Sequence, residues 1–505
     1  MKLKDLLEQA HIKCVRGSLD KEIKDIVYDS RKAGPGAVFV AINGFKTDSH
    51  RFLGQTAEQG ATAVVIEKEW AELDEGVRRL FEEKDITVLK AEDGREALAL
   101  LSAAFFGYPT REMTVVGVTG TKGKTTTTSM LAAILRQAGY KVGVIGTNGV
   151  DIGGRHIPSE NTTPEPYLIQ QYARMMVQEG CRFLIMEASS TGIKFHRTDG
   201  IDFDIGLFTN LSPDHIGTLE HPDFEDYRDN KAKLFARCRR GILNRDDEHF
   251  ETMLRGAKCE ISTFGTGKPK AGHPYPDLAA KEIIYEKQNG VLGSRVRLEG
   301  SDSFEFFVSM PGDFNVCNAL GAVAAARALG VGEEPIREAL KSITVAARVE
   351  TLFSSEDLTV ILDYAHNEVS ATALLSMLRA YHPGRIVVIF GAEGERAQIR
   401  RKEMGETCGR LADFCILSSQ NPGDEPIEDI FREIHHYLDP SGTPSVDMPD
   451  RAEAIRYALK NAQKGDILAV IGKGDENYDL VRGVKHPWLD RDEIDKALRE
   501  LGFKE

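Results

Sequence analysis

A glycine-rich turn between a strand pattern and a helix pattern holds the residues of this chain best suited to chemistry. The sequence Thr119-Gly-Thr-Lys-Gly-Lys-Thr-Thr126 follows a β-branched run, 114–118, and precedes a helical pattern that extends to about residue 137. Such a strand, turn and helix make a phosphate cradle, because backbone N–H groups at the helix start point at the phosphates. Lys124 adds a positive charge, and Thr125 offers a hydroxyl to Mg²⁺. The nucleotide-binding residues predicted here are Gly120, Thr121, Lys122, Gly123, Lys124, Thr125 and Thr126.

The turn departs from the common P-loop pattern at one position. Val118 stands where that pattern has its first glycine, five residues before the glycine of Gly-Lys. We therefore interpret the segment as a variant loop, and we expect Gly117 and Gly120 to tighten it.

Further polar residues follow the next predicted strands. Glu187 ends the run 183–186, and His215 lies just beyond the run 205–209. A carboxylate at the carboxyl end of a neighbouring strand is placed to bind Mg²⁺ beside a phosphate loop. From the residues alone, Glu187 can equally be a solvated loop residue and His215 an ordinary histidine. Lys231 lies on a predicted helix, 224–237, where a solvated charge is the usual role.

Three polar loops in the last third of the chain also follow strand patterns. They are Asp363-Tyr-Ala-His366, Gly391-Ala-Glu-Gly-Glu-Arg396 and Gly472-Lys-Gly-Asp-Glu476. Because the carboxyl ends of parallel strands meet at one edge of a sheet, these loops predict a second site. Three ordinary surface turns are the alternative.

The order of the patterns predicts an α/β protein of three domains. A chain of 505 residues is too long for one core. We expect a small N-terminal α/β domain at 1–110, a central domain at 111–345 and a C-terminal Rossmann-like α/β domain at 346–505. Alternating strands and helices predict a parallel sheet in the central domain, the P-loop mononucleotide-binding domain. Residues 281–310 alternate more and predict an antiparallel extension.

The composition excludes several classes of function. A formal net charge of −14 makes a large nucleic-acid footprint improbable on physical grounds. Seven scattered cysteines form no Cys-x-x-Cys pair, which argues against a zinc site or a disulfide framework and for a reducing cytoplasm. No apolar run approaches membrane-spanning length, so we expect no membrane span. We expect a cytoplasmic monomer.

Taken together, the motifs resemble the Mur ligase family over essentially the whole chain. The marks are the loop 119–126, Asn161-Thr-Thr-Pro164, Glu187-Ala-Ser-Ser190, Thr209-Asn-Leu-Ser212 with Asp214-His215, Lys231-Ala-Lys-Leu-Phe235, Gly312-Asp-Phe-Asn-Val-Cys-Asn318, Arg348-Val-Glu350 and Asp363-Tyr-Ala-His366. Asp29-Ser-Arg31 is typical of the branch that adds the third amino acid of the peptidoglycan stem. Each motif is weak alone, but their order and spacing are specific.

The resemblance implies an ATP-dependent amide ligase of peptidoglycan synthesis. ATP phosphorylates the free side-chain carboxyl of UDP-MurNAc-L-Ala-D-Glu, and the amine of an amino acid then attacks the acyl phosphate. Phosphoryl transfer to a carboxylate brings negative groups together, which requires clustered positive charge. Lys124, His215 and Mg²⁺ ions can supply it. Lys231 matches a lysine that the family carbamylates with CO₂, and it acts with Lys124 and His215 as a catalytic residue.

The resemblance also implies ligand roles for residues in all three domains. The expected metal ligands are Thr125, Glu187, His215 and carbamylated Lys231. The expected adenine contacts are Asn315, Asn318 and Arg348. The expected UDP-MurNAc-dipeptide contacts are Tyr28, Ser30, Phe45, Lys46, Thr47, Asn161, Thr162, Thr163, Ser189 and Arg197. Phe195 departs from the family, because many relatives carry Gln there.

The C-terminal domain is expected to choose the amino acid, through Arg396, Gln420, Asn421, Gly423, Gly472 and Glu476. Enzymes of the family that add meso-diaminopimelate carry Asp-Asn-Pro-Arg where this chain has Gln420-Asn-Pro-Gly423. Gly423 cannot pair with a carboxylate, whereas Asp424, Glu425 and Glu476 can pair with an ammonium. The sequence therefore favours L-lysine over meso-diaminopimelate. The alternative is a diaminopimelate site that uses a different arginine.

Three other functions compete with this one. A Mur-like ligase such as folylpolyglutamate synthase would act on another carboxylate and amine, but it lacks the uridine-binding domain marked by Asp29-Ser-Arg31. A catalytically silent binding protein would not need Lys124, Glu187, His215 and Lys231. A P-loop GTPase switch would carry an Asn-Lys-x-Asp motif, which this sequence lacks.

Overall fold

The computed structural model describes residues 1–44, 47–214, 216–217, 220–267, 275–299, 303–343, 349–394, 398–474 and 476–504. The chain forms two compact units, Met1–Ala279 with Leu320–Ile336, and Ala280–Ala319 with Arg337–Glu505. Each unit is described by itself. The boundaries fall within one strand and two helices, so the predicted domain limits stay predictions. Among the described residues, no helix combines the length and apolar character needed to span a membrane.

The first unit begins with a small sheet in the order β1-β5-β4-β3-β2. Strands β2 to β5 pair in parallel, and β1 joins β5 in antiparallel register. Apolar side chains fill both faces of β3 and β4, so helices cover this sheet on both sides. The elements are α1 Leu3–Leu6, β1 Lys13–Arg16, β2 Asp25–Val27, β3 Ala37–Val40, α2 Leu53–Glu58, β4 Ala63–Ile66, α3 Glu75–Glu83, β5 Thr87–Lys90 and α4 Gly94–Phe105.

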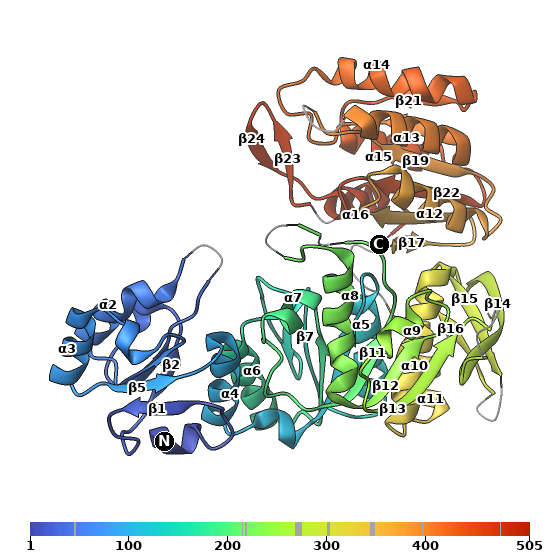
Figure 1. Cartoon of the computed structure of the whole chain (residues 1–505). Coiled ribbons are helices and arrows are strands. Elements are labelled where there is room, and N and C mark those ends of the chain that lie inside the picture. Colours follow the sequence, from blue (N-terminus) through green and yellow to red (C-terminus); the bar gives the residue numbers. More distant parts are fainter. Residues whose placement is uncertain are drawn as a thin grey trace. The chain divides into compact units, whose positions relative to one another are not determined.

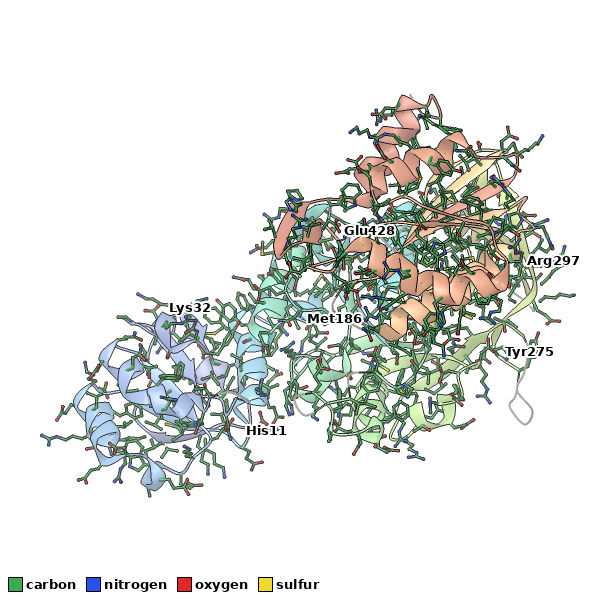
Figure 2. All side chains as sticks on the ribbon, turned by 90° about the horizontal axis from the view of Figure 1, so that it is seen from above. His11, Lys32, Met186, Tyr275, Arg297 and Glu428 are labelled. Atoms are coloured by element: carbon green, nitrogen blue, oxygen red, sulfur yellow. The ribbon has the colours of Figure 1, made fainter. Side chains whose placement is uncertain are left out.

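The rest of the first unit is built on a larger sheet, in the order β13-β12-β11-β6-β10-β7-β8-β9. The strands from β13 to β7 are parallel, and β8 and β9 continue as antiparallel strands. Met186 in β10, labelled in Figure 2, is fully buried. The elements are β6 Thr114–Thr119, α5 Lys124–Gln137, β7 Val142–Gly146, β8 Gly149–Ile152, β9 Arg155–Ile157, α6 Pro166–Gln178, β10 Phe183–Glu187, α7 Ser190–Lys194, β11 Phe203–Phe208, α8 Phe224–Ala232, β12 Cys238–Asn244, α9 Phe250–Met253 and β13 Glu260–Gly265.

This arrangement places the predicted site residues at one edge of the sheet. Strands β6, β10 and β11 are adjacent and parallel, so the residues that follow them leave the sheet on the same side. The phosphate loop follows β6, Glu187 ends β10, and the segment Thr209–Ser212 follows β11. Parallel pairing thus gathers three motifs that lie far apart in the sequence.

Five elements connect the large sheet to the C-terminal part of the chain. β14 Leu278–Gln288 begins beside β13, and β15 Val291–Glu299 and β16 Glu305–Val308 form an antiparallel pair in the second unit. The predicted antiparallel extension at 281–310 is confirmed. Two helices follow, α10 Asp313–Ala328 and α11 Glu333–Lys341.

The second unit contains a six-stranded sheet in the order β17-β18-β22-β19-β20-β21. All its neighbouring pairs are parallel except β17 with β18. A separate hairpin, β23–β24, is red in Figure 1. The elements are β17 Glu350–Ser354, β18 Leu358–Asp363, α12 Glu368–Arg379, β19 Ile386–Phe390, α13 Gln398–Leu411, β20 Phe414–Leu417, α14 Ile427–Leu438, β21 Ser445–Asp447, α15 Arg451–Lys460, β22 Asp466–Ile471, β23 Tyr478–Val481, β24 Val484–Pro487 and α16 Asp490–Glu500.

The α/β class and the parallel central and C-terminal sheets are confirmed, whereas two local expectations need correction. The helix expected at 224–237 is α-helical only to Ala232 and continues as a 3₁₀ turn, Lys233–Ala236. Gly117 does not tighten the phosphate loop, because it lies inside β6. A β-carbon there would come within 2.7 Å of the Phe203 ring, so Gly117 makes room for the packing of Phe203.

Candidate active site

The phosphate loop occupies the four residues between β6 and α5. Gly120 and Gly123 have φ angles of 148° and 83°, which other residues rarely adopt. Asn210, which follows β11, holds the loop from outside: its carbonyl oxygen accepts from Thr121 N at 2.8 Å, and its Oδ1 accepts from Lys122 N at 2.9 Å. The loop is therefore shaped by its glycines and by the neighbouring strand end.

Two lysines from distant parts of the sequence meet at one carbonyl group of this loop. Lys124 Nζ and Lys231 Nζ each donate a hydrogen bond of 2.8 Å to the carbonyl oxygen of Gly120. Lys124 Nζ also donates to the carbonyl oxygen of Thr121. The arrangement places two amines that can carry positive charge beside the start of α5, where phosphate groups are favoured.

Lys231 is 1% exposed and has no ion pair with any carboxylate of the described residues. Its Nζ lies 4.4 Å from the centre of the Tyr227 ring, and the Tyr227 hydroxyl is 3.0 Å from Thr121 Oγ1. Burial, followed by repulsion from Lys124, holds the pKa of Lys231 well below the ordinary value for lysine. The ε-amine is thus biased toward its neutral form, which is a nucleophile.

Glu187 is a buried carboxylate, 1% exposed, and its hydrogen-bond partners among the described residues are neutral. Oε1 accepts from Thr125 Oγ1 at 2.9 Å and from Thr147 N at 2.9 Å, and Oε2 accepts from Thr147 Oγ1 at 3.2 Å. Gly146 leaves room for it, because a β-carbon there would come within 2.4 Å of Oε1. A buried anion beside a threonine hydroxyl is a fitting partner for Mg²⁺, which needs only one or two protein ligands when phosphates supply others.

No cluster of three histidine, cysteine or acidic side chains suited to a metal occurs within the described part of the chain. The predicted metal ligands Thr125, Glu187 and Lys231 nevertheless all lie around the phosphate loop. His215, the fourth predicted metal ligand, lies outside the described residues.

Four of the predicted dipeptide-binding residues form a connected group beside Glu187. Thr163 Oγ1 donates to the backbone oxygen of Glu187 at 2.8 Å and to Ser189 Oγ at 3.0 Å. Arg197 Nη1 donates to the carbonyl oxygen of Thr163 at 2.9 Å, and Thr162 Oγ1 is 3.0 Å from Thr147 Oγ1. Hydroxyl and guanidinium donors are therefore gathered next to the candidate metal position.

The remaining predicted UDP-MurNAc-dipeptide contacts of the first unit include Tyr28, Ser30, Thr47 and Asn161. Tyr28 is half-buried, and burial raises the pKa of its hydroxyl, with smaller electrostatic effects of Glu165 and Arg197. Ser30 begins a 3₁₀ turn capped by the carboxylate of Asp29. Thr47 and Asn161 are exposed. Phe45 and Lys46, also predicted here, lie outside the described residues.

Two of the three predicted adenine contacts are described, and both belong to the second unit. Asn315 and Asn318 lie in α10 and are buried; Asn315 Nδ2 donates to the carbonyl oxygen of Pro311 at 2.8 Å. Arg348 lies outside the described residues, as does Arg396, which was predicted to bind the amino acid.

The loops at the carboxyl ends of the second unit's strands contact one another. Asn421 joins them: its Nδ2 donates to Glu476 Oε2 at 2.8 Å, and its carbonyl oxygen accepts from Gly394 N at 3.1 Å. The Tyr364 hydroxyl donates to Glu476 Oε1 at 3.2 Å. Gln420 is buried against Gly472, where a β-carbon would come within 2.2 Å of Gln420 Oε1. The predicted residues Gln420, Asn421, Gly472 and Glu476 are thus brought together.

The sequence analysis assigned no role to a buried lysine at this rim. Lys473 is fully buried, and its Nζ lies 3.1 Å from Asp479 Oδ1 and 3.6 Å from Glu476 Oε2. It also donates to Asn421 Oδ1 at 2.8 Å. Thr147, Tyr227 and Asn210 were missed in the same way. Only Asn210 had a sequence signal, since it belongs to the motif after β11.

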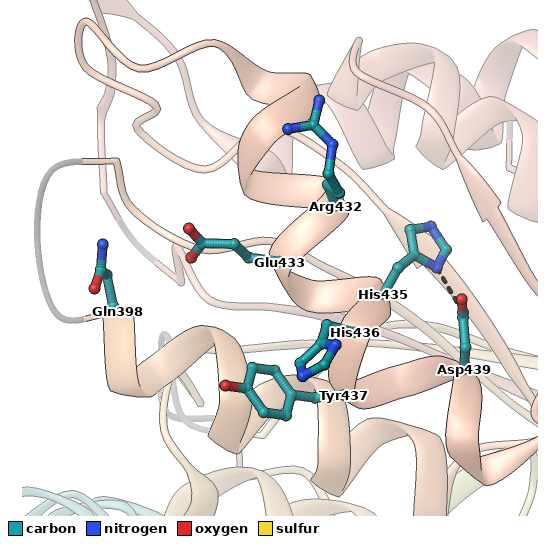
Figure 3. Close-up of a pocket in the computed structure, with 7 residues that line it drawn as sticks. All are labelled: Gln398, Arg432, Glu433, His435, His436, Tyr437 and Asp439. Carbon is teal, nitrogen blue, oxygen red and sulfur yellow. Dashed lines mark hydrogen bonds and ion pairs between the residues drawn. The ribbon is translucent and has the colours of Figure 1, made fainter.

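A hollow elsewhere in the second unit is lined by none of the predicted residues. It encloses about 680 Å³ and is bordered by Gln398, Arg432, Glu433, His435, His436, Tyr437 and Asp439, as Figure 3 shows. In it, His435 Nδ1 lies 2.8 Å from Asp439 Oδ1.

Comparison with known protein families agrees with this geometry. Three family models match: "Mur ligase family, catalytic domain" at residues 22–106, "Mur ligase middle domain" at 118–326 and "Mur ligase, glutamate ligase domain" at 347–474. The middle model covers the phosphate loop, Glu187 and Lys231, and the third covers the rim as far as residue 474, which leaves out Glu476.

Whole-chain relatives lead to the same family. The chain is 38% identical to UDP-N-acetylmuramoyl-L-alanyl-D-glutamate–2,6-diaminopimelate ligase of Caldanaerobacter subterraneus, over 99% of both chains. It is 33% identical to the enzyme of that name from Clostridium perfringens, over 95% of this chain and 96% of the relative. A solved structure of a ligase with the same name superposes with a TM-score of 0.80 at 26% identity, covering 99% of each chain.

The structure contains a phosphate loop and a Thr125–Glu187 pair on a parallel sheet, and the family models match this region. Together they define an ATP-dependent ligase that forms a C–N bond between an acid and an amino acid. The chain belongs to the Mur ligase family.

Proposed function

We propose that this enzyme adds the third amino acid to UDP-MurNAc-L-Ala-D-Glu in peptidoglycan synthesis, and that the added residue is a diamino acid. The printed names of the 38% and 33% identical relatives support the substrate. The observation that carries the proposal is the meeting of Lys124 and Lys231 at the carbonyl of Gly120, beside the Thr125–Glu187 pair. ATP, Mg²⁺ and this acid are its expected ligands.

The reaction proceeds in two balanced steps. The γ-carboxylate oxygen of the D-Glu residue attacks the γ-phosphorus of ATP, and ADP leaves. The amine of the amino acid then attacks the acyl carbon, inorganic phosphate leaves, and the amine proton passes to solvent. The first step brings two negative groups together, and the second develops negative charge on the acyl oxygen and the leaving phosphate, so we expect the ammonium of Lys124 and the N-terminus of α5 to stabilise both transition states.

Thr125 and Glu187 suit a Mg²⁺ ion, with His215 and a carbamylated Lys231 as further expected ligands. When bound, Mg²⁺ neutralises charge on the phosphates. The protein's contribution is to hold Glu187 in place through Thr147 and to keep the Thr125 hydroxyl directed at it.

The environment of Lys231 supports the expected carbamylation. The neutral ε-amine attacks the carbon of CO₂, a proton is released, and an anionic carbamate replaces the amine. The depressed pKa of Lys231 supplies the neutral amine, and the lack of a carboxylate partner among the described residues leaves room for a new anion. The modification turns a buried potential cation into a group suited to Mg²⁺.

For the amino acid, we propose meso-diaminopimelate, with L-lysine as the second candidate. The names of the relatives favour diaminopimelate. The sequence-based preference for L-lysine rests on Gly423, which provides no guanidinium at the position where a diaminopimelate site is expected to have one. Cytoplasmic location and a monomeric state stay predictions.

The test is ADP release by the purified protein with ATP, Mg²⁺ and UDP-MurNAc-L-Ala-D-Glu, with each of meso-diaminopimelate, L-lysine and L-ornithine in turn. We expect amine-dependent ADP release and a product whose mass is that of the tripeptide nucleotide. A folate substrate with glutamate serves as the control for the related ligase. Absence of turnover with every muramoyl substrate would contradict the proposal, and turnover on folate alone would replace it.

A further inference from the structure

The hairpin β23–β24 of the second unit is joined by backbone hydrogen bonds to the loop that carries Gly423. Gly423 N donates to the carbonyl oxygen of Leu480 at 3.0 Å, and Arg482 N donates to the carbonyl oxygen of Gly423 at 2.7 Å. These two bonds form a parallel bridge between Gly423 and Val481. The hairpin thus adds a strand to the loop.

This pairing holds Arg482 beside Gly423. The tight turn of the hairpin is Arg482-Gly483, and both residues have positive φ angles, 51° and 72°. These two backbone hydrogen bonds, one on each side of Val481, fix the register of the hairpin relative to the loop. Gly423 has no side chain, and the backbone of Arg482, which carries a guanidinium, lies directly beside it.

Arg482 is exposed, and within the described residues its guanidinium has no ion pair. The other described cations nearby are engaged: Arg401 pairs with Glu425 at 2.6 Å, and Lys473 pairs with Asp479 at 3.1 Å. Lys485, on the same hairpin, lies 3.9 Å from the centre of the Tyr478 ring. Arg482 is therefore the described cation at this loop that is available to a ligand.

The rim also offers an acid that is linked to this hairpin. Glu476 is fixed by Asn421, by the Tyr364 hydroxyl and by Lys473, whose Nζ lies 3.6 Å from its Oε2. Asn421 Oδ1 in turn accepts from Leu480 N, in the hairpin, at 3.1 Å. An exposed guanidinium and a fixed carboxylate are thus attached to one hydrogen-bonded assembly. Such a pair is complementary to a group that carries both a carboxylate and an ammonium.

We propose that Arg482 determines amino-acid specificity by binding the distal carboxylate of 2,6-diaminopimelate, while Glu476 receives the distal ammonium. The inference rests on the proposed function and deepens it. The distal centre of diaminopimelate carries both charges, whereas the side chain of lysine ends in the ammonium alone. A guanidinium binds a carboxylate through two parallel hydrogen bonds, which lysine cannot offer. The guanidinium that Gly423 lacks is supplied from the hairpin.

The experiment measures kcat and KM of the full-length enzyme for meso-diaminopimelate and for L-lysine. The variant is Arg482→Asn, because asparagine tolerates the left-handed backbone of the turn. We expect KM for diaminopimelate to rise roughly 10- to 100-fold, the worth of a charged hydrogen-bonded pair, with kcat nearly unchanged. Lysine kinetics should not change. Lys485→Ala, which removes an equal charge from the same hairpin, is the matched control and should leave both substrates unaffected.

A second variant moves the guanidinium across the bridge. Gly423→Arg in the Arg482→Asn background should recover part, but not all, of the affinity for diaminopimelate, because a side chain at φ 63° is strained. A purely structural role of Arg482 would predict equal losses for both amino acids and no recovery.

The outcomes separate this inference from the proposed function. If Arg482→Asn leaves turnover with diaminopimelate unchanged, the role of Arg482 is overturned and the proposed ligase function stands. Turnover with lysine but not diaminopimelate in the unmodified enzyme overturns the role of Arg482 and the choice of amino acid. A selective loss for diaminopimelate, rescued by Gly423→Arg, supports the inference.

Discussion

The two units each bury a lysine, and the surroundings of the two ammonium groups are opposite. Lys231, in the first unit, donates to the carbonyl of Gly120, lies against the Tyr227 ring and has no carboxylate partner among the described residues. Lys473, in the second unit, lies 3.1 Å from Asp479 and 3.6 Å from Glu476. Both side chains are almost completely buried.

Under the proposed function, this difference separates a lysine used for chemistry from one used for structure. Taking an ammonium out of water is costly unless an anion compensates it, so an uncompensated lysine becomes neutral and reactive. The pKa of Lys231 is accordingly depressed by burial and by Lys124. Lys473 has two carboxylates and Asn421 as partners, and these contacts tie together the loops of the rim. Burial alone does not mark a lysine as a candidate for chemistry, whereas burial without a carboxylate partner does.

The largest effect is expected from removing the amine of Lys231. Lys231→Ala should lower ligase turnover roughly 100- to 1,000-fold, because it removes a group that helps to stabilise charge in the transition state. The measurement is ADP release with UDP-MurNAc-L-Ala-D-Glu and the preferred amino acid. Bicarbonate should stimulate the unmodified enzyme in CO₂-depleted buffer and have no effect on the variant. Near-normal turnover of the variant would refute the carbamate.

The complementary change should act on stability. Lys473→Met leaves Asp479 and Glu476 without their buried cation, and it should lower the free energy of unfolding of the second unit by roughly 3–5 kcal/mol. Urea unfolding followed by circular dichroism measures this loss. The matched control is Lys231→Met, which removes an uncompensated amine and should cost little or even stabilise. Equal destabilisation by the two variants would contradict the claim that only Lys473 compensates buried carboxylates.

His221 extends the comparison to pH. Its Nδ1 lies 2.6 Å from Asp226 Oδ2 and its Nε2 lies 3.0 Å from Ser190 Oγ. Burial lowers the pKa of His221 and outweighs the Asp226 hydrogen bond, which would raise it. The unfolded chain therefore binds a proton more readily, and the first unit should lose stability as pH falls below about 6.5. Comparing the pH dependence of Tm with that of His221→Gln checks this, and an identical dependence would contradict it.

His435, in the second unit, should show a smaller effect of the opposite sign. Burial tends to lower the pKa of His435, but hydrogen bonds to Asp439 and Asp447, both 2.8 Å, raise it overall. Its stabilising contribution is complete below about pH 6.5 and is lost as pH rises through the folded-state pKa. NMR titration of the imidazole should give a pKa above that of an exposed histidine. A value below it would reverse the prediction.

Much of the fold could be predicted because its signals are local. The phosphate loop, the strand ending at Glu187 and the antiparallel segment after residue 280 are each marked by a short pattern of residue types. The specific clustering could not be predicted in the same way. Lys231 Nζ and the carbonyl oxygen of Gly120 are separated by 111 residues in sequence, and Asn421 meets Glu476 across 55 residues.

The sequence by itself determined the family, the α/β class and the loop that binds phosphate, since neighbouring residues set backbone conformation and strand and helix patterns. Only the tertiary structure decided which lysine is compensated and which is not, and that Arg482 lies beside Gly423. The reason is that compensation of a charge depends on groups within a few ångströms in space, and parallel strand pairing and a hairpin joined to a loop bring such groups together from anywhere in the chain.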